Sequence, residues 1–250
     1  MSLKTPLSRP WVVALSFALL GGFFTSSLPA QDQGKTKRAP DPALLPIEDE
    51  PGLPRVLLIG DSISIGYTLA VREKLKGKAN VHRPRANCGP TTAGLEHLDA
   101  WLATGGEGKK WDVIHFNWGL HDLKYLGPNG ENLAEPGSAG SHRQVSPEEY
   151  RKNLEALVAK LQATGAKLIW RNTTPVPEGA KGRVVADALV YNEIAKDVMA
   201  RSQVAVHDLY SFAFERLDRI QKPADVHFTP EGSEILAEDV VRVILEALQP

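Results

Sequence analysis

The feature that most constrains the fold of this chain is an alternation between short apolar runs and longer segments with helical spacing. Five runs have the length of strands, and we expect strands at residues 55–59, 80–85, 112–118, 167–172 and 204–206. The helical spacing predicts helices at residues 63–75, 92–103, 147–164, 183–199 and 230–248. Because strands that alternate with helices form a parallel sheet covered on both faces, the sequence predicts a three-layer α/β/α sandwich with a central five-stranded parallel sheet.

Composition and charge exclude several classes of protein. The formal net charge is -1, so no basic field favours binding to nucleic acid. Cys88 is the only cysteine, which excludes a disulfide within the chain and a zinc site built on cysteines. The histidines other than the candidate site residues are scattered without ligand spacing, so we expect neither a metal nor another cofactor.

The first 30 residues have the pattern of a secretory signal peptide. Lys4 and Arg9 precede an apolar run at residues 11–24, and the segment ends on the small residue Ala30. The run is shorter than the ~20 apolar residues that span a bilayer, so we expect cleavage and no stable membrane insertion afterwards. We therefore expect residues 1–30 to direct export, to a secreted or periplasmic location.

Residues 31–52 are polar and rich in proline, which predicts a flexible linker. The folded domain is then expected to occupy residues 53–250.

Polar residues follow the predicted strands at the edge of the sheet where ligands bind in such folds. Ser62 follows the first strand at the start of a helix, and its backbone N–H could stabilise an oxyanion. The alternative is that Ser62 only caps that helix. After the second strand, Gly89 lets the backbone approach a ligand, although an ordinary turn would also explain it.

Two further clusters complete this set. Residues 117–122 follow the third strand and could supply a side-chain donor to the same oxyanion. His227, in a short loop before the last helix, can accept a serine proton, and the nearby Asp225 can orient its ring. Taken together, these residues are the nucleophile, oxyanion donors and base that acyl transfer requires.

The order of these clusters resembles that of the SGNH (GDSL-like) hydrolases. Residues 60–63 resemble the serine block of that family, residues 87–94 the glycine block, residues 119–122 the Gly-x-Asn-Asp block, and residues 225–230 the final Asp/His block. The resemblance implies a flavodoxin-like SGNH hydrolase fold, ester hydrolysis with Ser62 as nucleophile and His227 as base, and an oxyanion hole that includes the N–H groups of Ser62 and Gly89.

The sequence departs from the family pattern in two places. His121 stands where the family usually has the oxyanion asparagine, so either His121 or the nearby Asn117 could supply that donor. The family commonly has Asp-x-x-His, whereas one residue fewer separates Asp225 from His227 here. Two arrangements are therefore open: Asp225 completes a triad, or a backbone carbonyl orients His227 and leaves a dyad.

From these residues we predict an exported serine esterase that hydrolyses short-chain carboxylic esters, for example O-acetyl groups on carbohydrate, through an acyl-Ser62 intermediate. Trp118 and Asp122 are predicted to contact the substrate, and the segments 123–145 and 175–182 to form walls of the pocket. The expected partner is a small-molecule or glycan ester, and the oligomeric state is left open. Three alternatives also remain: a lysophospholipase-like lipid esterase, a non-catalytic glycan-binding protein on the same fold, and an O-acyltransferase.

Export of the chain can be tested by N-terminal sequencing of the protein from its native host. We expect a mature protein that begins close to residue 31, because the signal peptide is removed during translocation. An intact Met1 on protein from the soluble cytosolic fraction would contradict the expectation.

Overall fold

The computed structural model describes residues 39–249, so the signal peptide predicted at residues 1–30 lies outside the described residues. A five-stranded sheet lies at its centre, with β1 (Arg55–Ile59), β2 (Asn80–His82), β3 (Val113–Phe116), β6 (Lys167–Arg171) and β7 (Ala205–His207). The strand order is β2-β1-β3-β6-β7, and every neighbouring pair is parallel. The predicted five-stranded parallel sheet is therefore confirmed.

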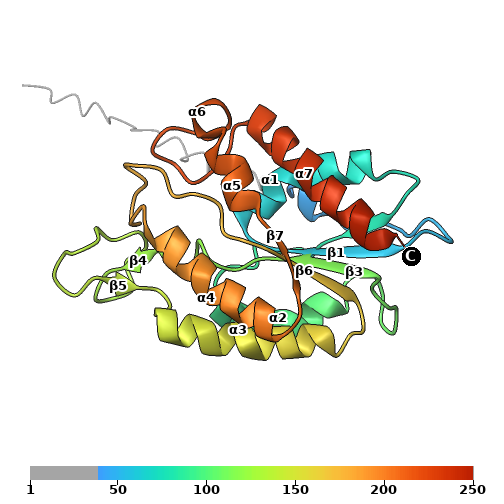
Figure 1. Ribbon diagram of the computed structural model, residues 1–250, viewed down its shortest axis with the longest axis horizontal. Helices are drawn as coiled ribbons and strands as arrows, with labels where there is room; N and C mark the ends of the chain where they lie inside the picture. The colour runs from blue at the N-terminus through green and yellow to red at the C-terminus, as the bar shows by residue number, and fades with distance from the viewer. Residues whose placement is uncertain (1–38, 250) are drawn as a thin grey trace, which may run out of the picture. The chain divides into compact units, whose positions relative to one another are not determined.

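Helices cover both faces of this sheet (Figure 1). One face carries α1 (Ser62–Lys74), α5 (Leu209–Phe214), α6 (Leu217–Ile220) and α7 (Pro230–Leu248), and the other carries α2 (Thr91–Leu102), α3 (Pro147–Gln162) and α4 (Asp187–Arg201). All residues of β1 and β3 are buried, as expected for strands covered on both sides. The three-layer architecture is thus confirmed. Within residues 39–249, none of the helices combines the length and apolar character needed to cross a membrane.

Most predicted elements agree with the structure to within a few residues, and the differences have local causes. The strand expected at residues 80–85 ends at His82, because Pro84 has no N–H to continue the ladder. The helix expected at residues 183–199 begins only at Asp187, and Arg183 remains in the preceding loop, where its side chain donates to the Leu120 carbonyl.

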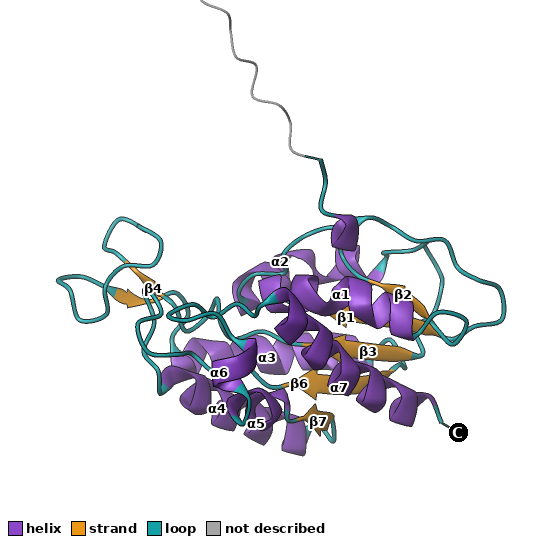
Figure 2. Ribbon diagram, turned by 90° about the horizontal axis from the view of Figure 1, so that it is seen from above, coloured by secondary structure: helices purple, strands orange, loops and turns teal. Residues whose placement is uncertain are grey.

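The segment 123–145 contains a feature that was not predicted. Its ends form a small antiparallel hairpin of β4 (Tyr125–Leu126) and β5 (His142–Arg143), separate from the main sheet. Figure 2 shows this hairpin projecting from the sandwich, beyond one end of the sheet. The two strands are too short to give a period-two pattern in the sequence, which explains why the segment was expected to be a loop.

The expected linker at residues 31–52 is wrong for its described part, residues 39–52. These residues include a short 3-10 helix, η1 (Pro42–Leu44), and pack on the domain. The carboxylate of Asp49 pairs with His82, Arg55 and Lys109 at 2.6, 3.1 and 2.6 Å. Although burial raises it, hydrogen bonds from Lys109 and His82 lower the pKa of Asp49 to about 2. The polar, proline-rich composition concealed this anchor, so the domain begins earlier than residue 53.

A chain of hydrogen bonds between buried side chains crosses the core between the sheet and α7. His115 on β3 lies 3.1 Å from Nδ1 of His207 on β7, and Nε2 of His207 lies 2.7 Å from the Asp239 carboxylate. Because a carboxylate accepts, neutral His207 donates through Nε2 and accepts from Nε2 of His115. Burial lowers the pKa of both histidines, for His115 well below its usual range.

This arrangement predicts that acid destabilises the fold through His115. Its pKa is lower in the folded state, so the unfolded chain binds more protons as the pH falls through about 6.5, and stability is lost below that pH. If His115 stays neutral in the folded protein, its contribution makes the free energy of unfolding about 1.4 kcal/mol lower at pH 5.5 than at pH 7.5.

Urea unfolding of wild type, His115→Gln and His142→Gln at the two pH values measures this effect. His115→Gln should have the smaller pH dependence, whereas the exposed His142→Gln should behave as wild type. An equal pH dependence in all three proteins would show that His115 does not carry the effect.

Candidate active site

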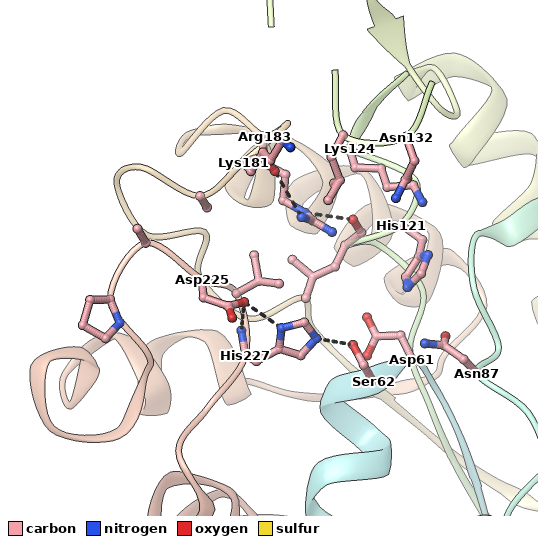
Figure 3. A pocket seen from close by; sticks show the side chains of 16 residues that line it. Asp61, Ser62, Asn87, His121, Lys124, Asn132, Lys181, Arg183, Asp225 and His227 are labelled. Atoms are coloured by element: carbon pink, nitrogen blue, oxygen red, sulfur yellow. Dashed lines mark hydrogen bonds and ion pairs between the residues drawn. The ribbon is translucent and has the colours of Figure 1, made fainter. Parts of the chain in front are cut away.

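Three predicted residues, Ser62, His227 and Asp225, form a chain of hydrogen bonds beside a pocket (Figure 3). Ser62 Oγ lies 2.9 Å from Nε2 of His227, and Nδ1 of His227 lies 2.6 Å from Oδ1 of Asp225. This is the geometry in which an imidazole accepts the serine proton and a carboxylate stabilises the resulting imidazolium.

The turn between β1 and α1 places the Ser62 hydroxyl at the pocket. Asp61, not Ser62, caps the helix, because its carboxylate accepts the N–H of Ile63 at 3.0 Å. The Ser62 hydroxyl is thereby left for His227. Gly60 allows the tight turn, since a Cβ there would lie 2.8 Å from Cβ of Ser64. The alternative that Ser62 only caps the helix is therefore excluded.

The loop before α7 holds His227 and Asp225 in place. The Lys222 N–H donates to the His227 carbonyl at 3.0 Å, and Gln221 pairs with Phe228 across the loop. Asp225 folds back over one residue, so that Oδ1 accepts both the backbone N–H and Nδ1 of His227. Although burial raises it, these hydrogen bonds lower the pKa of Asp225. The shortened Asp-x-His spacing therefore still brings the carboxylate to the imidazole.

Of the two candidate side-chain donors to the oxyanion, His121 and Asn117, only His121 lines the pocket. Burial lowers the pKa of His121, and a neutral imidazole keeps one N–H donor. Asn117 is buried, and both ends of its carboxamide bind Arg171. Its amide nitrogen donates to the Arg171 carbonyl at 2.7 Å, and its oxygen accepts from the Arg171 guanidinium at 2.7 Å. Asn117 is therefore a structural residue beneath the site.

In the glycine block, the Gly89 N–H that was expected to stabilise the oxyanion has a partner within the chain. The N–H of Gly89, at a positive φ of 56°, donates to Oδ1 of Asn87 at 3.0 Å. This contact fixes the orientation of the Asn87 carboxamide, and Figure 3 shows its nitrogen turned towards Asp61 and Ser62. Asn87 was not singled out from the sequence, although an asparagine two residues before a glycine is a known turn signal.

The expectation that Trp118 and Asp122 contact the substrate is wrong. Trp118 is only 1% exposed, and its ring packs on Trp101 in the core. Asp122 is fully buried, and one carboxylate oxygen accepts the N–H and the hydroxyl of Thr91 at 2.8 and 2.5 Å. Burial raises the pKa of Asp122 to about 7. The loop after β3 turns inward at these positions, so both side chains support the site from below.

The pocket itself has a volume of about 680 Å³, which is within the range of small-molecule sites. Both segments expected to form its walls contribute to it, through Lys124, Asn132 and Leu133 from one and Ala180 and Lys181 from the other. Cys88 is buried outside this pocket, and burial raises the pKa of its thiol to about 11. A thiolate nucleophile is therefore not available here. Among residues 39–249, no group of three potential metal ligands is found.

Fold and site together define a serine hydrolase of the SGNH type. The model of the GDSL-like lipase/acylhydrolase family matches residues 58–235 of the chain. The chain belongs to this family, and it is a carboxylic ester hydrolase. The comparison with curated proteins finds no match.

Solved structures of other hydrolases share the fold. A lipase/acylhydrolase from Enterococcus faecalis is 21% identical with a TM-score of 0.61, and the alignment covers 79% of this chain and 98% of that one. The acetyl xylan esterase AlAXEase is 14% identical with a TM-score of 0.58, over 76% of this chain and 99% of that one. TesA is 18% identical with a TM-score of 0.56, over 78% and 99%. At these identities the similarity establishes the fold.

Proposed function

We propose that this chain is an exported serine esterase that removes short acyl groups, such as O-acetyl groups, from carbohydrate. The observation that carries the proposal is the chain of hydrogen bonds from Asp225 through His227 to Ser62 at an open pocket. The pattern of residues 1–30, which lie outside the described residues, supports export. The acetyl xylan esterase among the similar structures fits the proposed chemistry.

The proposed reaction has two steps. Nε2 of His227 takes the proton of Ser62 as Oγ attacks the ester carbonyl, and Asp225 stabilises the imidazolium. His227 then gives the proton to the departing alcohol, which leaves an acyl group on Ser62. In the second step His227 activates water, which releases the acid and restores Ser62.

The oxyanion needs donors, and three groups are available for it. The N–H of Ser62 lies in the first turn of α1, where helix N–H groups have no partner within the helix. His121 lines the same pocket and carries one imidazole N–H. We assign the third donor to the amide nitrogen of Asn87, because the N–H of Gly89 already holds the Asn87 oxygen.

Short acyl groups are favoured by the charges in the pocket. Four charged side chains line it besides the proposed catalytic residues, namely Asp61, Lys124, Lys181 and Arg183. An alkyl chain long enough to extend from Ser62 to these side chains would remove their charges from water without pairing them, which is unfavourable. This favours acetyl-sized groups over the lysophospholipase-like alternative.

The catalytic assignment predicts how two substitutions affect a panel of p-nitrophenyl esters from acetate to palmitate. Ser62→Ala should lower kcat/KM by at least about 10⁴-fold, because the nucleophile is lost. Asp225→Asn should lower it by up to about 10⁴-fold, because the imidazolium loses its partner. The exposed Ser211→Ala, on α5, is the control and should match wild type.

Each outcome of this panel separates the alternatives. Highest activity of wild type on palmitate would favour a lipid esterase. Full activity of Ser62→Ala would refute the nucleophile, and an unchanged rate for Asp225→Asn would favour a dyad. The non-catalytic glycan-binding protein would be favoured by three results for the wild type together: no ester is cleaved, a fluorophosphonate does not label the protein, and glycan binds tightly.

The assignment of Asn87 predicts a separate effect on kcat. Asn87→Asp keeps an oxygen for the Gly89 N–H but removes the donor, so kcat for p-nitrophenyl acetate should fall by roughly 10²–10³-fold. Asn132→Asp places the same charge elsewhere in the pocket and controls for it. If Asn87→Ala keeps or raises kcat, the assignment of Asn87 is wrong. The Asn87 side chain would then only occupy the Gly89 N–H, and Gly89 would be the oxyanion donor.

A further inference from the structure

Three cations line the side of the pocket that lies across from the proposed catalytic residues. Figure 3 shows Lys124, Lys181 and Arg183 together, apart from Ser62 and His227. Lys124 lies in the loop after β3, immediately before β4, and the other two belong to the loop that precedes α4. Segments almost sixty residues apart in the sequence therefore contribute charges to one wall.

No carboxylate among residues 39–249 forms an ion pair with these three cations. The two acids that line the same pocket already have other partners, because Asp61 caps α1 and Asp225 accepts from His227. Arg183 donates to the carbonyls of Leu120 at 3.2 Å and Lys181 at 3.4 Å, so it also ties the two loops together. The wall thus keeps a positive charge that the protein does not neutralise by direct contact.

The electrostatic setting of the wall favours an anion. Burial lowers the pKa of Lys124, and the positive charge of Arg183 lowers it further, while Asp122 opposes the change. Burial also lowers the pKa of Arg183, while the negative charges of Asp61 and Asp225 oppose the change. Like charges that are held together and partly removed from water are stabilised when an anion binds between them.

The bond-making and bond-breaking steps of the proposed acyl transfer do not use these cations. The reacting ester is neutral, and its oxyanion is assigned to the N–H groups of Ser62, His121 and Asn87. A pocket of about 680 Å³ is also far larger than an acetyl group, so it has room for sugar residues. The cations are therefore placed to contact the alcohol part of the ester.

We propose that the alcohol part of the substrate is an acidic glycan, whose carboxylate or sulfate binds Lys124 and Lys181 while its acyl group lies at Ser62. This inference rests on the proposed function and adds the class of substrate to it. Carboxylates and sulfates share the chemistry that lysine recognises, which is a compact negative charge with oxygen acceptors.

Three methyl glucosides with the same single O-acetyl group provide the test. They differ only at carbon 6, which is a free CH₂OH group in the first, oxidised to a carboxylate in the second and sulfated in the third. The rate of acetate release gives kcat/KM for each. Wild type should prefer at least one of the charged sugars over the neutral one by about tenfold, since hydrogen bonds to charged groups contribute strongly. The two charged sugars distinguish a uronate from a sulfated substrate, and added salt should reduce the preference by screening.

Substitutions locate the preference on the wall. In the double variant Lys124→Gln/Lys181→Gln, the ratio of charged to neutral kcat/KM should fall towards one. Lys152→Gln, at an exposed position on α3 outside the pocket, is the matched control and should keep the wild-type ratio. A ratio that survives in the double variant would overturn the inference.

The outcomes separate this inference from the proposed function. An enzyme that cleaves p-nitrophenyl acetate but shows no preference for the charged sugars, or cleaves neither of them, overturns the inference and leaves the esterase assignment standing. A folded wild type that releases acid from none of these esters overturns the proposed function, and the inference fails with it.

Discussion

The site depends on one constraint, which is that the strands of the main sheet all run in the same direction. Their carboxyl ends therefore lie at one edge, and the loops after β1, β2 and β3 bring Ser62, Asn87 and His121 to a single pocket. The helix cap adds the second requirement. Because the Asp61 carboxylate accepts the Ile63 N–H at the start of α1, the hydroxyl of Ser62 remains available to His227. A strand reversal or a serine cap would separate groups that are adjacent here.

Buried polar side chains hold these loops in register. Arg83 is buried and donates to the carbonyls of Gly60 and Ala86, both at 3.2 Å, so it links the turn of the nucleophile to the loop of Asn87. Asp122 ties the loop after β3 to the start of α2 in a similar way. Such groups are stable inside a protein only when their hydrogen bonds are made, which makes them effective at fixing one arrangement of loops. The pocket is thus supported by a layer of buried polar side chains that do not line it.

The walls of the pocket come from the least regular parts of the chain. The segment 123–145 and the loop before α4 carry no strong periodicity, yet they place Lys124 and Lys181 on one wall. The rigid sandwich fixes the proposed catalytic residues, while these loops set what can approach them. This division is common in α/β enzymes, because loops can vary without disturbing the buried sheet.

The sequence by itself determined how the five strands of the main sheet alternate with the five long helices, since burial on both faces of a parallel sheet requires continuous apolar runs such as residues 55–59. It also identified Ser62 after the first strand, and Asp225 and His227 in the short loop before the last helix. Only the tertiary structure decided which polar residues of one loop face the pocket: His121 lines it, whereas Asp122 lies in the core. The direction of a side chain in a loop depends on contacts distant in sequence, and periodicity has no information about them.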